Sequence, residues 1–157
     1  MDNNDTLDSL TRQFRELYDS MAQTCAAAEE AGRWDIGRNG SMEGFVFAAL
    51  SGAILSLLVS DGNVGERETE YLNGAFGFDY TVDDLLGLFR FSARDLRENA
   101  VPNVKETVLT LEEADAAAAK DFRALLKLAC RIISESDDGV LNAETDLIRR
   151  LEEAAGE

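Results

Sequence analysis

The chain has 157 residues, of which 45% are hydrophobic, and its 31 acidic and 15 basic side chains give a formal net charge of -16. A chain of this length and composition buries a full core without disulfide staples, which excludes a disordered class. The negative field repels phosphate backbones and anionic lipid, so we expect no nucleic-acid or membrane binding and favour cations or a basic protein partner.

The N-terminal region predicts an amphipathic helix followed by a glycine-rich loop. The first ten residues show no signal peptide, so we expect a cytoplasmic protein. Across residues 5–31, apolar residues recur at intervals of three and four, which is typical of one helix face. Residues 32–40 contain three glycines and predict a loop with Trp34 folded back onto the core. We treat residues 1–40 as one region and 41–157 as the main helical domain.

An uncharged apolar run of seventeen residues extends from Gly44 to Ser60. This length is at the lower limit of a membrane-spanning helix, about 17 to 25 residues. Asp61 follows at once, where a spanning helix more often has basic residues. We therefore predict a central helix over residues 42–59 that is buried on all sides.

The residues from about Gly65 or Glu66 to Phe76 predict a further helix. The dipeptide Asn73-Gly74 is also the strongest short signal for a β-hairpin. The arms of such a hairpin would be only four residues long, and Gly77 interrupts the second arm. We therefore favour the helix.

The middle of the chain predicts short helices separated by a break. Thr81 and Ser92 are candidate N-caps of two such helices. Pro102 predicts the break, because the residue before a proline is pushed out of the helical region. The pattern from Thr110 to Glu113 matches a capping box that opens a long helix reaching Ile133.

The remaining segments complete an all-α fold. Residues 104–110 could form a strand, but a single strand has nothing to pair with. Asn142 is a candidate cap for a last helix over residues 143–155. We predict a single-domain helical bundle of about six to eight helices.

The two cysteines, Cys25 and Cys130, lie 105 residues apart in apolar surroundings. Neither has a second cysteine nearby to form a redox or metal pair, so we expect buried free thiols. The chain has no histidine, which argues against a zinc or other transition-metal site.

Two acidic stretches, residues 60–72 and 136–148, match when one is shifted by 76 residues. A shift of 77 residues aligns the Asp-Gly pairs instead, but it places Arg149 at the apolar position of Leu72. We predict two pseudo-repeated helix–loop–helix hairpins, around 50–76 and 126–155. The matched residues are Asp61 with Asp137, Val64 with Val140, and Glu68 with Glu144.

In both stretches an Asp-Gly turn follows an apolar helix and precedes an aliphatic residue and a glutamate that opens the next helix. This pattern, over residues 42–155, resembles the TerB-like domains associated with tellurite resistance. The resemblance implies an all-helical fold, a link to bacterial chemical stress, and acidic clusters that act as divalent-cation or interaction sites. An extra acidic residue in the second stretch leaves open which aspartate is equivalent there. The implied metal ligands are Asp61, Glu68, Asp137, Asp138 and Glu144.

Oxygen ligands of this kind suit Ca²⁺ or Mg²⁺. The stretches are not EF-hands, because placing the required glycine at the sixth position puts Leu57 or Ser134 where the first aspartate belongs. Plain helix capping explains the same residues without any ligand, since Asp-Gly makes a turn and an early glutamate favours a helix N-terminus.

Enzyme chemistry is disfavoured, because the chain has no histidine to act as a general base and no phosphate-binding glycine loop after a strand. We expect a non-enzymatic stress-response accessory module that binds Ca²⁺ or Mg²⁺ at the acidic loops. The alternative is a protein–protein interaction module without metal, which docks a basic or helical partner on an acidic face or in an apolar groove beside the central helix. A third reading is that the acidity reflects a salt-adapted source. Homo-oligomerisation stays open.

Overall fold

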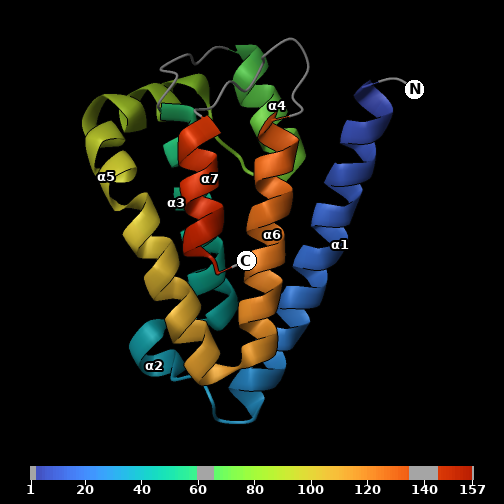
Figure 1. Cartoon of the computed structure of the whole chain (residues 1–157), viewed down its shortest axis with the longest axis vertical. Helices are drawn as coiled ribbons and strands as arrows, with labels where there is room; N and C mark the ends of the chain where they lie inside the picture. Colours follow the sequence, from blue (N-terminus) through green and yellow to red (C-terminus); the bar gives the residue numbers. More distant parts are fainter. Residues whose placement is uncertain (1–2, 60–65, 135–144, 157) are drawn as a thin grey trace.

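The structure is a computed structural model that describes residues 3–59, 66–134 and 145–156. These residues form seven α-helices and no strand, which confirms the predicted all-α bundle (Figure 1). The helices are α1 (Asn3–Glu30), α2 (Ile36–Asn39), α3 (Met42–Val59), α4 (Glu66–Phe76), α5 (Val82–Ala114), α6 (Ala116–Ser134) and α7 (Thr145–Ala154).

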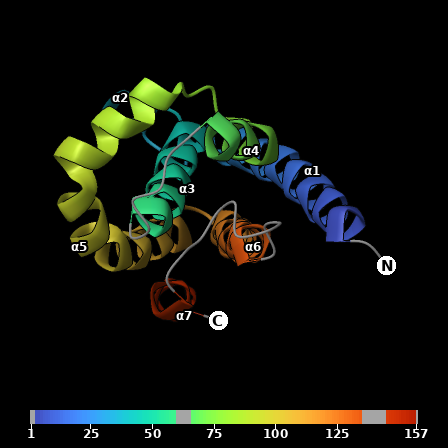
Figure 2. The same cartoon turned by 90° about the horizontal axis from the view of Figure 1, so that it is seen from above.

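Helix α3 lies in the middle of the bundle, between α5 on one side and α6 on the other (Figure 2). The long helix α5 curves around α3, while α1 and α7 pack along α6. Helix α4 lies against α1 and the start of α5. Segments distant in sequence, such as α1 and α6, are therefore direct neighbours.

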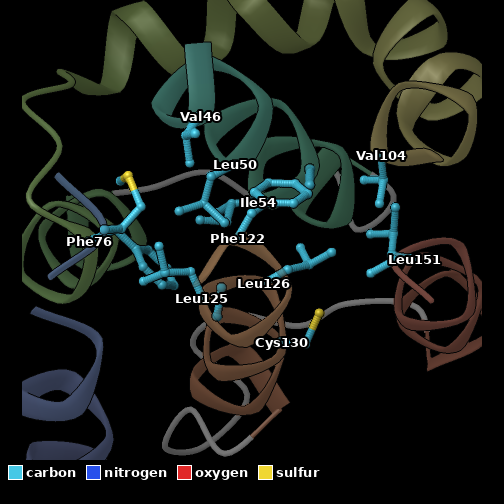
Figure 3. Close-up of a cluster of buried hydrophobic side chains, with 14 of the residues drawn as sticks. Val46, Leu50, Ile54, Phe76, Val104, Phe122, Leu125, Leu126, Cys130 and Leu151 are labelled. Atoms are coloured by element: carbon cyan, nitrogen blue, oxygen red, sulfur yellow. The ribbon is translucent and has the colours of Figure 1, made fainter. Parts of the chain in front are cut away.

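The core runs between the helices, with the inner face of α1 packed on α6, and Figure 3 shows the part where α3, α5, α6 and α7 meet. Leu50 and Ile54 of α3 face Phe122 and Leu126 of α6, and all four side chains are buried. Burying an apolar side chain of this size contributes about 1.5 to 3 kcal/mol. This packing, rather than local helix propensity, holds the short helices in place.

The expected loop of residues 32–40 contains one short helix that was not predicted. Trp34 is buried as expected, and its indole N–H donates to the Gly40 carbonyl at 2.9 Å. The Asp35 carboxylate accepts a hydrogen bond from the Arg38 N–H at 3.2 Å and so caps the single turn of α2. Glycine density alone gives no sign of such a capped turn.

Thr81 caps a helix as predicted. Its hydroxyl accepts from the Asp84 N–H and the Asp84 carboxylate accepts from the Thr81 N–H, each at 3.0 Å. This is a reciprocal capping box.

The predicted break at Pro102 and the predicted cap at Ser92 are wrong, because both residues lie inside the continuous helix α5. Pro102 removes one helical hydrogen bond, at a cost of about 3 kcal/mol in a helix interior. Its ring faces solvent, whereas Ala100 and Val104 on either side are buried. Burial of the inner face of α5 against α3 therefore outweighs the proline, and residues 104–110 are helical rather than extended.

The predicted helix start at Thr110 is also wrong, since Thr110 to Glu113 form the end of α5. The chain breaks at Asp115, whose N–H donates to the Leu111 carbonyl at 2.7 Å. The Asp115 carboxylate accepts from the Ala117 N–H at 2.8 Å and caps α6. Both sites carry good capping residues. Leu111 is fully buried as part of α5, so α5 continues past Thr110 and the next helix is capped at Asp115 instead.

Helix α3 is less buried than predicted. Residues 53–56 are buried on every side, but Gly44, Phe47 and Ala48 are exposed along the first half of the helix. Within the part of the chain that the structure describes, no helix has the length and apolar character needed to cross a membrane. Phe47, on this exposed side of α3, forms one wall of a surface groove.

Candidate functional site

Most of the predicted metal ligands lie outside the residues that the structure describes. Asp61, Asp137, Asp138 and Glu144 lie outside the described residues. The backbone of Glu68 lies in the first turn of α4, and its side chain is not described. Among the described residues, no three Asp, Glu, Cys or His side chains gather closely enough to hold a metal ion. The metal site stays a prediction.

The helices that flank the two acidic stretches meet at one end of the bundle. Helices α3 and α6 end there, and α4 and α7 begin there (Figures 1 and 2). The predicted pair of helix–loop–helix hairpins requires that these four helix ends lie at the same end of the bundle.

A surface hollow of about 360 Å³ lies between α1, α3 and the end of α4. We call it the aromatic groove. Helix α1 contributes residues one turn apart, α3 contributes one exposed phenylalanine, and α4 contributes its last residue. The lining residues are Phe14, Arg15, Tyr18, Asp19, Phe47, Phe76 and Gly77.

The rings of the aromatic groove pack edge to face. Phe14 and Phe76 are buried, with ring centroids 5.3 Å apart at 72°. Tyr18 contacts Phe47 at 6.2 Å and 86°, and Phe47 contacts Phe78 at 5.7 Å and 81°. Such pairs add about 0.5 to 1.5 kcal/mol beyond their buried area. Phe47 nevertheless keeps 37% of its surface exposed, so the groove presents an aromatic wall to solvent.

One side chain holds the connection between α4 and α5. The Asn73 carboxamide donates to the Tyr80 carbonyl at 2.8 Å and accepts from the Tyr80 N–H at 3.0 Å. Gly77 ends α4 with φ of 73°, a left-handed conformation that favours glycine. The Asn-Gly pair that suggested a hairpin therefore lies in the last turns of a helix. We call the two hydrogen bonds between Asn73 and Tyr80 the Asn73 bracket. This bracket fixes the segment in which Phe76 packs against Phe14 of α1 and Phe78 packs against Phe47 of α3.

Two carboxylates and one arginine that donates a hydrogen bond to α4 lie at the groove. Asp19 lines the groove, and Glu43 accepts a hydrogen bond from the Tyr18 hydroxyl at 3.1 Å. The Arg15 guanidinium donates to the Gly74 carbonyl at 2.8 Å, near the negative end of the α4 dipole. Burial, reinforced by the hydrogen bond and charge of Glu43 and by the charge of Asp19, raises the pKa of Tyr18. The phenol therefore stays neutral and donates.

A second hollow of about 200 Å³ lies between α6 and α7, and its wall includes Lys120, Arg123 and Lys127. Arg123 has a structural task there. Its Nε–H donates to the Ala155 carbonyl at 2.7 Å at the end of α7, and its guanidinium pairs with Glu112 of α5. This arginine ties three helices together.

Both cysteines are buried free thiols, as predicted. Burial is the main cause that raises the pKa of Cys25 to about 11 and of Cys130 to about 12. Neutral, enclosed thiols are poor nucleophiles and poor metal ligands.

The residues of the aromatic groove were not predicted as a site. Helical periodicity places Phe14 on a core face, and Phe47 and Phe76 belong to other helices. The available signal was the aromatic density of residues 76–80, Phe-Gly-Phe-Asp-Tyr, directly after a helix. The sequence suggested only an unspecified apolar groove beside the central helix.

Comparison with protein-family models, with curated proteins and with solved structures gave no match for this chain. The resemblance to TerB-like domains therefore rests on the acidic sequence pattern alone.

Proposed function

We propose that this chain is a non-catalytic binding module that docks a partner protein in the aromatic groove. The observation that carries the proposal is the groove itself, a hollow of about 360 Å³ with Phe14 and Phe76 as a buried floor and Phe47 as an exposed wall. Aromatic side chains beside a pocket are characteristic of the residues that dominate binding energy in protein interfaces. An apolar partner side chain that fills such a pocket contributes about 1.5 to 3 kcal/mol.

The groove is held open by the fold. Its walls come from α1, α3 and α4, and the Asn73 bracket holds the last of these. A preformed pocket costs little to order on binding, so more of the contact energy appears as affinity.

Site-specific photo-crosslinking tests the proposal. A photoreactive phenylalanine analogue replaces Phe47 in one variant and Leu109 in the control, and both variants are expressed in the source organism. Leu109 is a matched control because it is 64% exposed on α5, away from the groove. We expect a discrete crosslinked partner only from position 47. Identical products from both positions, or none from position 47, would refute groove docking.

A second candidate function is divalent-cation binding at the acidic loops, with Asp61, Glu68, Asp137 or Asp138, and Glu144 as ligands to Ca²⁺ or Mg²⁺. The convergence of the four flanking helix ends at one end of the bundle and the charge of -16 support it. Calorimetric titration of the metal-free protein decides the question. Binding heat that is lost in Asp61→Asn and Glu144→Gln supports the site, and an unchanged melting temperature at millimolar ion refutes it.

The physiological role that we propose follows the TerB-like resemblance, a cytoplasmic accessory module in bacterial chemical stress. The duplicated acidic pattern supports it. A strain lacking the gene should be more sensitive to tellurite than its parent and should recover on complementation. Equal sensitivity would remove the stress role without affecting the groove.

A further inference from the structure

Two carboxylates and one cation lie at the aromatic groove among the described residues. Asp19 lines the groove, and the Glu43 carboxylate accepts a hydrogen bond from Tyr18 of the lining. The charge of Asp84 acts on Tyr80, close to the α4 wall. Arg15 in the lining donates to the Gly74 carbonyl and keeps its positive charge, so the two carboxylates leave one net negative charge at the groove. With a chain charge of -16 behind these groups, the local field favours a positively charged partner.

The walls of the groove favour a helical partner. Among the described residues every element is a helix, so the groove offers no sheet edge on which an extended peptide could add a strand. A hollow between helices suits the other common mode, in which an amphipathic helix places apolar side chains one turn apart into the groove.

Resting on the proposed function, we infer that the partner segment is a basic amphipathic helix: its apolar side chains enter the aromatic groove, and its Lys or Arg side chains meet the Asp19 and Glu43 carboxylates. A second copy of this chain is disfavoured as the occupant, since it carries the same charge of -16. Anionic lipid is disfavoured for the same reason.

Three synthetic peptides test the inference. The first is a helix with leucines at i, i+3, i+4 and i+7 on one face and lysines on the other. The second carries glutamine in place of every lysine, and the third carries alanine in place of every leucine. Each is titrated calorimetrically into the full chain and into Phe47→Ala, Asp19→Lys and the control Leu109→Ala, after circular dichroism shows that each variant is folded.

We expect the first peptide to bind wild type and Leu109→Ala equally, and to bind Phe47→Ala about tenfold more weakly. Asp19→Lys should weaken the lysine peptide but not the glutamine peptide, and added salt should act in the same way. The alanine peptide should lose most of its affinity. Sedimentation of the free protein at the same concentrations should show no self-association through Phe47.

The inference is overturned if the lysine and glutamine peptides bind equally, if Phe47→Ala binds the first peptide like wild type, or if no peptide binds. Self-association that Phe47→Ala abolishes would also overturn it, in favour of a second copy. Crosslinking from position 47 is scored separately. A crosslinked partner without peptide selectivity leaves groove docking intact and removes only the basic helix.

Discussion

Replacing Asn73 with alanine tests the bracket that shapes the aromatic groove. The Asn73 carboxamide makes both of its hydrogen bonds to the backbone of Tyr80, at 2.8 and 3.0 Å. Alanine removes both bonds and leaves the Tyr80 N–H and carbonyl to find other partners. The connection from α4 to α5, which includes Phe76 and Gly77, should loosen.

The expected loss of stability follows from the two bonds. Each contributes about 0.5 to 1.5 kcal/mol net, which gives about 1 to 3 kcal/mol together. Alanine has the higher helix propensity and returns up to about 0.7 kcal/mol, because Asn73 lies inside α4. We therefore expect the free energy of unfolding to fall by about 0.3 to 2.3 kcal/mol.

Urea unfolding followed by circular dichroism measures this change, with Asn103→Ala as the control. Asn103 is exposed within α5, so its replacement should leave stability unchanged or slightly increased. The Asn73→Ala protein should also bind the leucine–lysine peptide more weakly than Asn103→Ala does. If both variants unfold at the wild-type midpoint, the Asn73 bracket does not hold the groove and the reasoning fails.

Three further predictions concern the core, a cap and the thiols. Phe122→Ala removes a side chain that is fully buried at the centre of the core, so we expect unfolding to be easier by about 3 to 5 kcal/mol in urea; a loss below about 1 kcal/mol would contradict that placement. Thr81→Ala removes the hydroxyl of the capping box with Asp84 and should cost about 0.5 to 2 kcal/mol, whereas Thr81→Ser should restore most of it. The pKa values of Cys25 and Cys130 are raised to about 11 and about 12 in the folded protein, so the thiols ionise at lower pH in the unfolded chain. The free energy of unfolding should therefore be constant below the unfolded thiol pKa and should fall as the pH rises toward the folded values. Unfolding measured against pH should show a shallower decline in Cys130→Ala, and an equal slope would contradict the assignment.

Local sequence was sufficient where one signal acted alone. The apolar spacing of residues 5–31 predicted α1, and the uncharged run predicted α3. Thr81 was a cap without a nearby competitor, and it caps α5. In each case the segment itself contains the apolar residues that form one helix face, or the side chain that caps the free N–H groups of the first turn. Residues close together along the chain are therefore enough to predict the element.

Local sequence was insufficient where two signals competed. Pro102 predicts a break, but the burial of Ala100 and Val104 keeps α5 continuous. Thr110 and Asp115 are both good caps, and the buried Leu111 selects the second. The deciding energy in each case comes from α3 and α6, which approach α5 only after the chain has folded.

The pattern of apolar residues along the chain thus determined that this protein is a helical bundle, because a helix face is defined by residues three and four apart. The metal site at the acidic loops stays a prediction from the sequence. Only the tertiary structure determined the aromatic groove, because Phe14, Phe47 and Phe76 belong to three helices and become neighbours when α1, α3 and α4 pack together. Each residue alone reads as core, and the hollow between them exists only once all three helices are in place.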